Sequence, residues 1–192
     1  ANYFQHLDYL EDFNEKNGTH LVSAAGIHYE PMGIFPGKDK SATLDKIADG
    51  AKIAIPNDTT NEARALQLLV AEGLIELDPE AGLEATPKDV TKNEHKIEFV
   101  EMEAAALPTV LADVDFAVIN GNYALGAGLT EADGLAFEAA DSEAAKTYTN
   151  ALVVKEGNED NPAIKKLVEA LTSDECRAFL EEKYKGMVIP VF

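Results

Sequence analysis

Residues 53–61 read IAIPNDTTN, an apolar strand that runs directly into a polar turn and the start of a helix. Residues 116–123, FAVINGNY, repeat this arrangement with a second asparagine-bearing turn. In open α/β sheets, small ligands bind where strands end and helices begin, because unpaired backbone N–H groups and the positive ends of helix dipoles lie there. The two segments therefore predict an α/β protein that binds a small molecule.

The rest of the chain alternates segments of strand and helix character, which favours an α/β fold with a mostly parallel sheet. Apolar residues at helical spacing predict a first helix over residues 1–16, ended by the pair Asn17-Gly18. Thr59, followed three residues later by Glu62, is typical of a capping box and predicts a helix that starts at Thr59.

Composition narrows the class of protein. The chain has 192 residues, 46% of them hydrophobic, which is enough to bury a core in one domain or two small lobes. Its formal charge of -19 repels nucleic-acid phosphates and anionic lipid surfaces. No apolar stretch is long enough to cross a bilayer and no signal-peptide pattern opens the sequence, so the chain as given is expected to be soluble. A single cysteine, Cys176, excludes a disulfide within the chain.

The sequence motifs of common enzyme classes are missing: HExxH, GxSxG, CxxC and the Rossmann glycine fingerprint do not occur. The four histidines lack the spacing that puts two imidazoles on one metal ion, so neither a metal nor another cofactor is predicted. An α/β enzyme that acts on a small amino or carboxylic acid, with Glu101 or a histidine as general base, stays open as an alternative.

Arg64 is one of only two arginines, and it lies near the start of the helix predicted from Thr59. A cation at a helix start is electrostatically misplaced unless an anion, such as a ligand carboxylate, is its partner. Asn61 lies three residues earlier on the same helix face, and amide side chains can both donate to and accept from a zwitterion. We therefore expect Arg64→Ala to abolish ligand binding and to leave the fold intact.

Three further asparagines in the same two turns are candidate ligand-binding residues: Asn57, Asn120 and Asn122. A plainer interpretation is that asparagine is an ordinary turn residue whose side chain satisfies local backbone groups.

Ligand pockets combine a few polar anchors with an aromatic lining. Five aromatic or imidazole side chains are candidates for that lining: Phe4, His6, Tyr9, His28 and Tyr29. The alternative is that Phe4 and Tyr9 are core residues of the first helix.

These segments resemble the NlpA/MetQ family, the substrate-binding lipoproteins of methionine-type ABC importers. The matching strings run the length of the chain: NYFQH (2–6), YL (9–10), HYEPMG (28–33), IPND (55–58), TNE (60–62), RAL (64–66), VINGNYAL (118–125) and EEKYKG (181–186).

The resemblance implies a two-lobed periplasmic-binding-protein fold that closes on a free amino acid, usually L-methionine. Lobe I would comprise residues 1–33 and 151–192 and would be incomplete, because the family's first lobe begins earlier in its sequence; lobe II would span residues 34–150. The residues implied for the amino-acid head are Arg64, Asn61 and Asn120, with Asn57 and Asn122 as weaker contributors. Those implied for the side-chain pocket are Phe4, His6, Tyr9 and His28.

The family's partners are an ABC permease and its ATPase. Its location is the cell envelope, in the periplasm or at the outer face of the cell membrane, through a lipid anchor that we expect to be absent from the sequence as given. No catalysis is implied. The ligand stays open among L-methionine, D-methionine, a methionine dipeptide and another apolar amino acid. A third hypothesis is that the chain is a structural piece that assembles by strand exchange.

Overall fold

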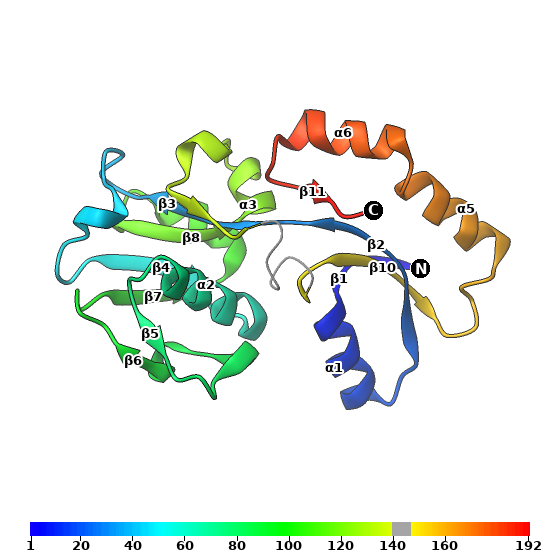
Figure 1. Cartoon of the computed structure of the whole chain (residues 1–192), viewed down its shortest axis with the longest axis horizontal. Helices are drawn as coiled ribbons and strands as arrows, with labels where there is room; N and C mark the ends of the chain where they lie inside the picture. The colour runs from blue at the N-terminus through cyan, green and yellow to red at the C-terminus, as the bar shows by residue number, and fades with distance from the viewer. Residues whose placement is uncertain (140–146) are drawn as a thin grey trace. The chain divides into compact units, whose positions relative to one another are not determined.

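The computed structural model describes residues 1–139 and 147–192, and it divides the chain into two compact units (Figure 1). Unit 1 consists of Ala1–Pro31 and Ala139–Phe192, and unit 2 of Met32–Glu138. Each unit combines helices with its own sheet, so the α/β class is confirmed. The lobe boundaries predicted from the sequence, 33/34 and 150/151, stay a prediction.

Unit 2 is built on a five-stranded mixed sheet. Its strands are β3 (Met32–Pro36), β4 (Lys52–Pro56), β7 (Glu98–Met102), β8 (Phe116–Asn120) and β9 (Ala136–Phe137), in the spatial order β7-β4-β8-β3-β9. β4 runs parallel to β7 and β8, whereas β3 runs antiparallel to β8 and β9. Strands β4 and β8 are buried at every position except Lys52, which accounts for their continuous apolar sequences, because a strand covered on both faces shows no alternation.

Helix α2 (Thr59–Ala71) lies along one face of this sheet (Figure 1). The core joins Ile53 and Ile55 of β4 to Leu66 and Leu69 of α2, and all four side chains are fully buried. Burial of this apolar face fixes α2 on the sheet and so fixes the position of its first turn.

Helix α2 begins at Thr59 as predicted, but its N-cap is Asp58. The Asp58 carboxylate accepts a hydrogen bond from the backbone N–H of Asn61 at 3.2 Å. The capping box predicted from Thr59 and Glu62 is therefore wrong by one residue, because the carboxylate immediately before Thr59 takes that position.

The remaining elements of unit 2 are short. They are β5 (Glu76–Leu77) paired with β6 (Val90–Lys92), helix α3 (Gly121–Gly126) and the 3-10 turns η1 (Leu44–Lys46), η2 (Gly82–Glu84), η3 (Pro87–Asp89), η4 (Ala104–Val110) and η5 (Glu131–Asp133).

Unit 1 carries a four-stranded sheet with the order β1-β10-β2-β11. Its elements are β1 (Asn2–His6), α1 (Leu7–Asn17), β2 (Leu21–Tyr29), β10 (Asn150–Lys155), α5 (Pro162–Leu171), α6 (Asp174–Tyr184) and β11 (Ile189–Pro190). Every described pairing in this sheet is antiparallel, so the expectation of a mostly parallel sheet is wrong for unit 1. β10, from the second half of the chain, lies between β1 and β2, a pairing that the local sequence pattern does not reveal.

The helix predicted over residues 1–16 is partly wrong, because residues 2–6 form strand β1 and α1 begins at Leu7. Strand β1 pairs with β10, a partner that the local spacing of apolar residues does not reveal. The pairing shifts register around Phe4, whose φ is 82°, as in a β-bulge. The predicted stop is correct: Gly18 ends α1 with a φ of 60°.

Among residues 1–139 and 147–192, no helix combines the length and apolar character needed to span a membrane.

Candidate functional site

The strand-turn-helix segments singled out in the sequence meet at one edge of the unit 2 sheet. β4 and β8 are parallel, with Ile53 opposite Phe116, so the turns that follow both strands emerge at the same edge. The side chains of these turns touch: the amide Nδ2 of Asn120 donates to Oδ1 of Asn61 at 2.9 Å. Asn61 in turn donates through Nδ2 to the capping carboxylate of Asp58 at 2.8 Å.

Arg64 belongs to the same group but carries its own carboxylate partner. Its Nε donates to Oε1 of Glu138 at 2.9 Å and its Nη2 to Oε2 at 2.6 Å, a bidentate pair. The side chains are 1% and 7% exposed, respectively. Nη1 also donates to Oδ1 of Asn61 at 3.5 Å, which places the guanidinium beside both asparagines. Glu138 thus supplies an anion for Arg64 within the chain, so the position of Arg64 near a helix start does not by itself require a ligand carboxylate.

Asn120 holds an unmet hydrogen-bonding group. Its side chain is buried, and its Oδ1 has no hydrogen-bond partner among the described residues. An acceptor buried in this way is costly unless a donor reaches it. The group formed by Asn61, Arg64 and Asn120, which we call the polar cluster, thus offers a cation, amide donors and one buried acceptor.

The other two asparagines lie outside the hydrogen bonds of the polar cluster. Asn122 is exposed, and its Oδ1 accepts the backbone N–H of Tyr123 at 2.8 Å, a local turn bond. Asn57 is also exposed, and its backbone N–H donates to the carbonyl of Met102 at 2.8 Å.

In unit 1, His28 is the centre of an aromatic and polar group. His28 is 1% exposed, and its Nε2 lies 3.0 Å from Oε1 of Glu30. The carboxylate accepts, so Nε2 donates, and Nδ1 is left to accept the hydroxyl of Tyr3. Burial raises the pKa of Tyr3 above its usual value, which keeps the hydroxyl protonated as a donor. The ring of Phe4 packs edge-on against His28 at 5.1 Å between centroids.

His6 and Tyr9 make different contacts. The His6 ring packs against Tyr148 at 5.6 Å between centroids. Tyr9 is 47% exposed, and its ring packs against Phe13 at 6.1 Å between centroids. Both rings line a surface pocket whose lining does not include His28. The structure therefore groups Phe4 with His28, places His6 with Tyr148, and separates Tyr9 from both.

Comparison with known proteins identifies the family. The profile of the NlpA lipoprotein family matches residues 1–192. This chain belongs to the NlpA lipoprotein family. It is 44% identical over 189 residues to the membrane lipoprotein TpN32 of Treponema pallidum, an alignment that covers 96% of this chain and 67% of the relative.

Two further relatives carry names that describe binding. The D-methionine-binding lipoprotein MetQ of Salmonella typhimurium is 40% identical over 189 residues, covering 97% of this chain and 68% of the relative. The solved structure of a nutrient-binding protein from Burkholderia cenocepacia bound to methionine has a TM-score of 0.89 and 40% identity, covering 100% of this chain and 78% of that one. The resemblance found in the sequence motifs is thus confirmed for the whole of this NlpA-family chain.

Sequence reasoning missed four residues that build these groups: Tyr3, Glu30, Glu138 and Asn150. Glu30 carried a usable signal, because it lies two residues after His28 and extended residues at that spacing share one face. Asn150 is 3% exposed and lies in register with His6 on one side and His28 on the other, but only the strand order reveals this. Nothing local to Arg64 points to Glu138, 74 residues away.

Glu62, next to Asn61 in α2, is a buried carboxyl group. Burial, assisted by the neighbouring carboxyl of Glu101, raises its pKa to about 7. Its Oε1 is buried without a hydrogen-bond partner in the described part of the chain.

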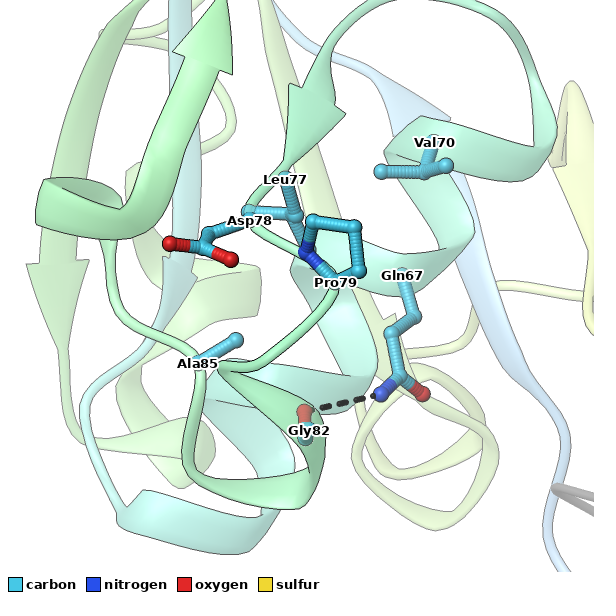
Figure 2. Close-up of a pocket in the computed structure, with 7 residues that line it drawn as sticks. All are labelled: Gln67, Val70, Leu77, Asp78, Pro79, Gly82 and Ala85. Atoms are coloured by element: carbon cyan, nitrogen blue, oxygen red, sulfur yellow. Dashed lines mark hydrogen bonds between the residues drawn. The ribbon is translucent and has the colours of Figure 1, made fainter.

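A pocket of about 270 Å³ on unit 2 is lined by none of these residues (Figure 2). It is lined by Gln67, Val70, Leu77, Asp78, Pro79, Gly82 and Ala85. The Gln67 amide is already engaged with the carbonyl of Gly82 at 3.2 Å, and Asp78 accepts the backbone N–H of Glu80 at 2.9 Å. These two polar groups of the pocket have partners, whereas Oδ1 of Asn120 has none among the described residues, so the polar cluster is the stronger candidate for the site.

The described residues also contain no group of three histidine, cysteine, aspartate or glutamate side chains arranged to hold a metal ion.

Proposed function

We propose that this chain binds methionine in the cell envelope and delivers it to an ABC importer, without catalysis. The observation that carries the proposal is the polar cluster, because it offers matched chemistry to both charged groups of a free amino acid. The methionine-binding names of the Salmonella and Burkholderia relatives support methionine as the ligand.

The amino-acid head would bind at the polar cluster. The first turn of α2 and the guanidinium of Arg64 both favour a carboxylate. The buried Oδ1 of Asn120, which has no hydrogen-bond partner among the described residues, would accept from the ammonium group. Asn61 links the two through its bonds to Arg64 and Asn120. Asn57 and Asn122 remain proposed as weaker contributors.

The aromatic group of unit 1 remains proposed for recognition of the ligand's apolar side chain. A thioether is polarizable and makes favourable contacts with aromatic rings, which suits Phe4 and His28. His6 and Tyr9 remain proposed for the same lining, Tyr9 with less support because its ring packs on Phe13. We add Asn150 to the proposed binding residues, because a buried amide in register with both His6 and His28 can bond a ligand polar group.

The proposed location and partners follow from the relatives. The Treponema and Salmonella proteins are named as lipoproteins, which supports attachment at the outer face of a membrane or in the periplasm. The proposed partners are the permease and ATPase of an amino-acid importer. No binding to nucleic acid is proposed, since a formal charge of -19 opposes it.

Isothermal titration calorimetry tests the proposal. The wild-type chain should bind L-methionine with one-to-one stoichiometry, and Asn120→Ala should weaken binding about 10- to 100-fold through loss of a buried hydrogen-bonding group. Asn158→Ala, which removes an exposed amide, is the matched control and should bind as the wild type does. Titration of D-methionine in parallel shows which of the two enantiomers binds with the higher affinity.

Equal affinity of the Asn120 and Asn158 variants would contradict the proposed site. Conversion of methionine to a product during incubation, measured by mass spectrometry, would instead favour an enzyme acting on a small amino acid.

A further inference from the structure

We propose that Glu138 is a positioning residue that fixes the guanidinium of Arg64 for recognition of the ligand carboxylate; this rests on the proposed function. Glu138 itself would make no contact with the ligand. It would act by holding Arg64 ionised, ordered and directed toward Asn61 before the ligand arrives.

The first support is the geometry of the pair. Both carboxylate oxygens of Glu138 accept from Arg64, along the edge formed by Nε and Nη2. A planar guanidinium held along one edge cannot rotate, so the direction of Nη1 toward Asn61 is set at the same time. The pair therefore determines how Arg64 is presented to the rest of the polar cluster.

The second support is that Glu138 makes two hydrogen bonds to β3 and follows a residue that is itself paired with β3. Its Oε2 accepts the backbone N–H of Met32 at 2.7 Å, and its own backbone N–H donates to the carbonyl of Met32 at 3.0 Å. The preceding residue, Phe137, pairs in register with Gly33 of β3. A Cβ on Gly33 would lie 2.4 Å from the Phe137 ring, so this ring packs directly over Gly33 in space that only a glycine leaves open.

Electrostatics explain why such a partner is needed. Burying an arginine without a counter-ion costs several kcal/mol, and this cost would destabilise the folded protein whenever no ligand is bound. A permanent carboxylate at Glu138 removes that cost in the unliganded protein. Preorganised groups also lose less conformational entropy when a ligand binds, which raises affinity.

Displacement of Glu138 by the ligand carboxylate is the competing interpretation. Displacement would break two bonds to Arg64 and one to Met32, all between buried groups. The geometry therefore favours a Glu138 that stays in place when the ligand is bound.

The test compares two ligands that differ only in the carboxylate. Affinities of L-methionine and L-methioninol, in which a hydroxymethyl group replaces the carboxylate, are measured by calorimetry for the wild type and for Glu138→Gln. We expect Glu138→Gln to weaken L-methionine binding at least about tenfold and to leave L-methioninol binding within about twofold, because only the former engages Arg64. Glu138→Asp should recover part of the loss by restoring the charge.

Glu131→Gln, an exposed glutamate of η5, is the matched control and should leave both affinities unchanged. A merely structural role for Glu138 would weaken both ligands equally and would overturn the inference. Absence of L-methionine binding by the wild type would overturn the proposed function as well, so the two failures are distinguishable.

A second measurement needs no variant. In the unliganded wild type, the Nε–H of Arg64 should exchange with solvent far more slowly in NMR spectra than that of Arg177, the other arginine, which stacks on the ring of Phe192. Equal exchange rates would show that Glu138 does not hold Arg64 in the empty protein and would overturn the inference.

Discussion

Removing the charge of Arg64 should destabilise unit 2 far more than removing an ordinary surface charge. The pair with Glu138 is bidentate and almost fully buried, with 1% and 7% of the side chains exposed. Loss of one partner leaves an uncompensated buried charge, which costs about 3–5 kcal/mol. The expectation from the sequence that Arg64→Ala leaves the fold intact is therefore revised: the variant should lose stability as well as binding.

A double-mutant cycle separates these two effects. Arg64→Met and Glu138→Met should each destabilise by about 3–5 kcal/mol, whereas the double variant should lose only about 1–3 kcal/mol, because two apolar side chains leave no buried charge and the main remaining cost is the lost acceptor of the Met32 backbone N–H. The double variant should nevertheless fail to bind methionine, since the proposed anchor for the carboxylate is gone.

Urea unfolding followed by far-UV circular dichroism measures the cycle. With a slope of about 2 kcal/mol per molar urea, each single variant should lower the midpoint by about 1.5–2.5 M. The exposed pair Lys16–Asp12, 2.8 Å apart with side chains 69% and 48% exposed, provides the control, and Lys16→Met should cost no more than about 0.5 kcal/mol. A loss below about 1 kcal/mol for Arg64→Met, or a double variant as unstable as the sum of the singles, would refute the reasoning.

Two further predictions concern stability. The pKa of Glu62 is raised to about 7 from a usual 4.5, so between these pH values the folded state binds more protons than the unfolded state. The free energy of unfolding should therefore fall as the pH rises through this window. Glu62→Gln, which no longer titrates with Glu101, should remove the decline and gain about 1–3 kcal/mol of stability at pH 8. Parallel stability curves from pH 5 to 8 would contradict this. Gly33→Ala places a Cβ 2.4 Å from the Phe137 ring and should lower the free energy of unfolding in urea by about 1–3 kcal/mol. Gly126→Ala, whose Cβ would have no atom within 4 Å, should be neutral. Equal effects of the two variants would contradict the close approach of the Phe137 ring to Gly33.

The central part of the fold and of the site was predictable because it follows from local sequence. The runs that became β4 and β8 are apolar throughout, and their parallel pairing brings the following turns to one edge of the sheet. The proximity of Asn61, Arg64 and Asn120 could therefore be anticipated from the segments themselves.

The rest depends on contacts between distant parts of the chain. The segment at residues 2–6 has helical spacing but forms a strand, because β10 pairs with it across most of the chain length. Glu138 could not be assigned as the partner of Arg64, since no pattern links two residues that β9 and α2 bring together. Asn150 is likewise identified only by the strand order that places β10 between β1 and β2.

Native mass spectrometry with added L-methionine tests the central claim most directly, because it reports the ligand, its stoichiometry and the oligomeric state together. We predict a monomer that retains one unmodified methionine, and the loss of that adduct in the Arg64→Met/Glu138→Met double variant. A wild-type chain that retains no methionine would contradict the account, and so would a double variant that retains the adduct.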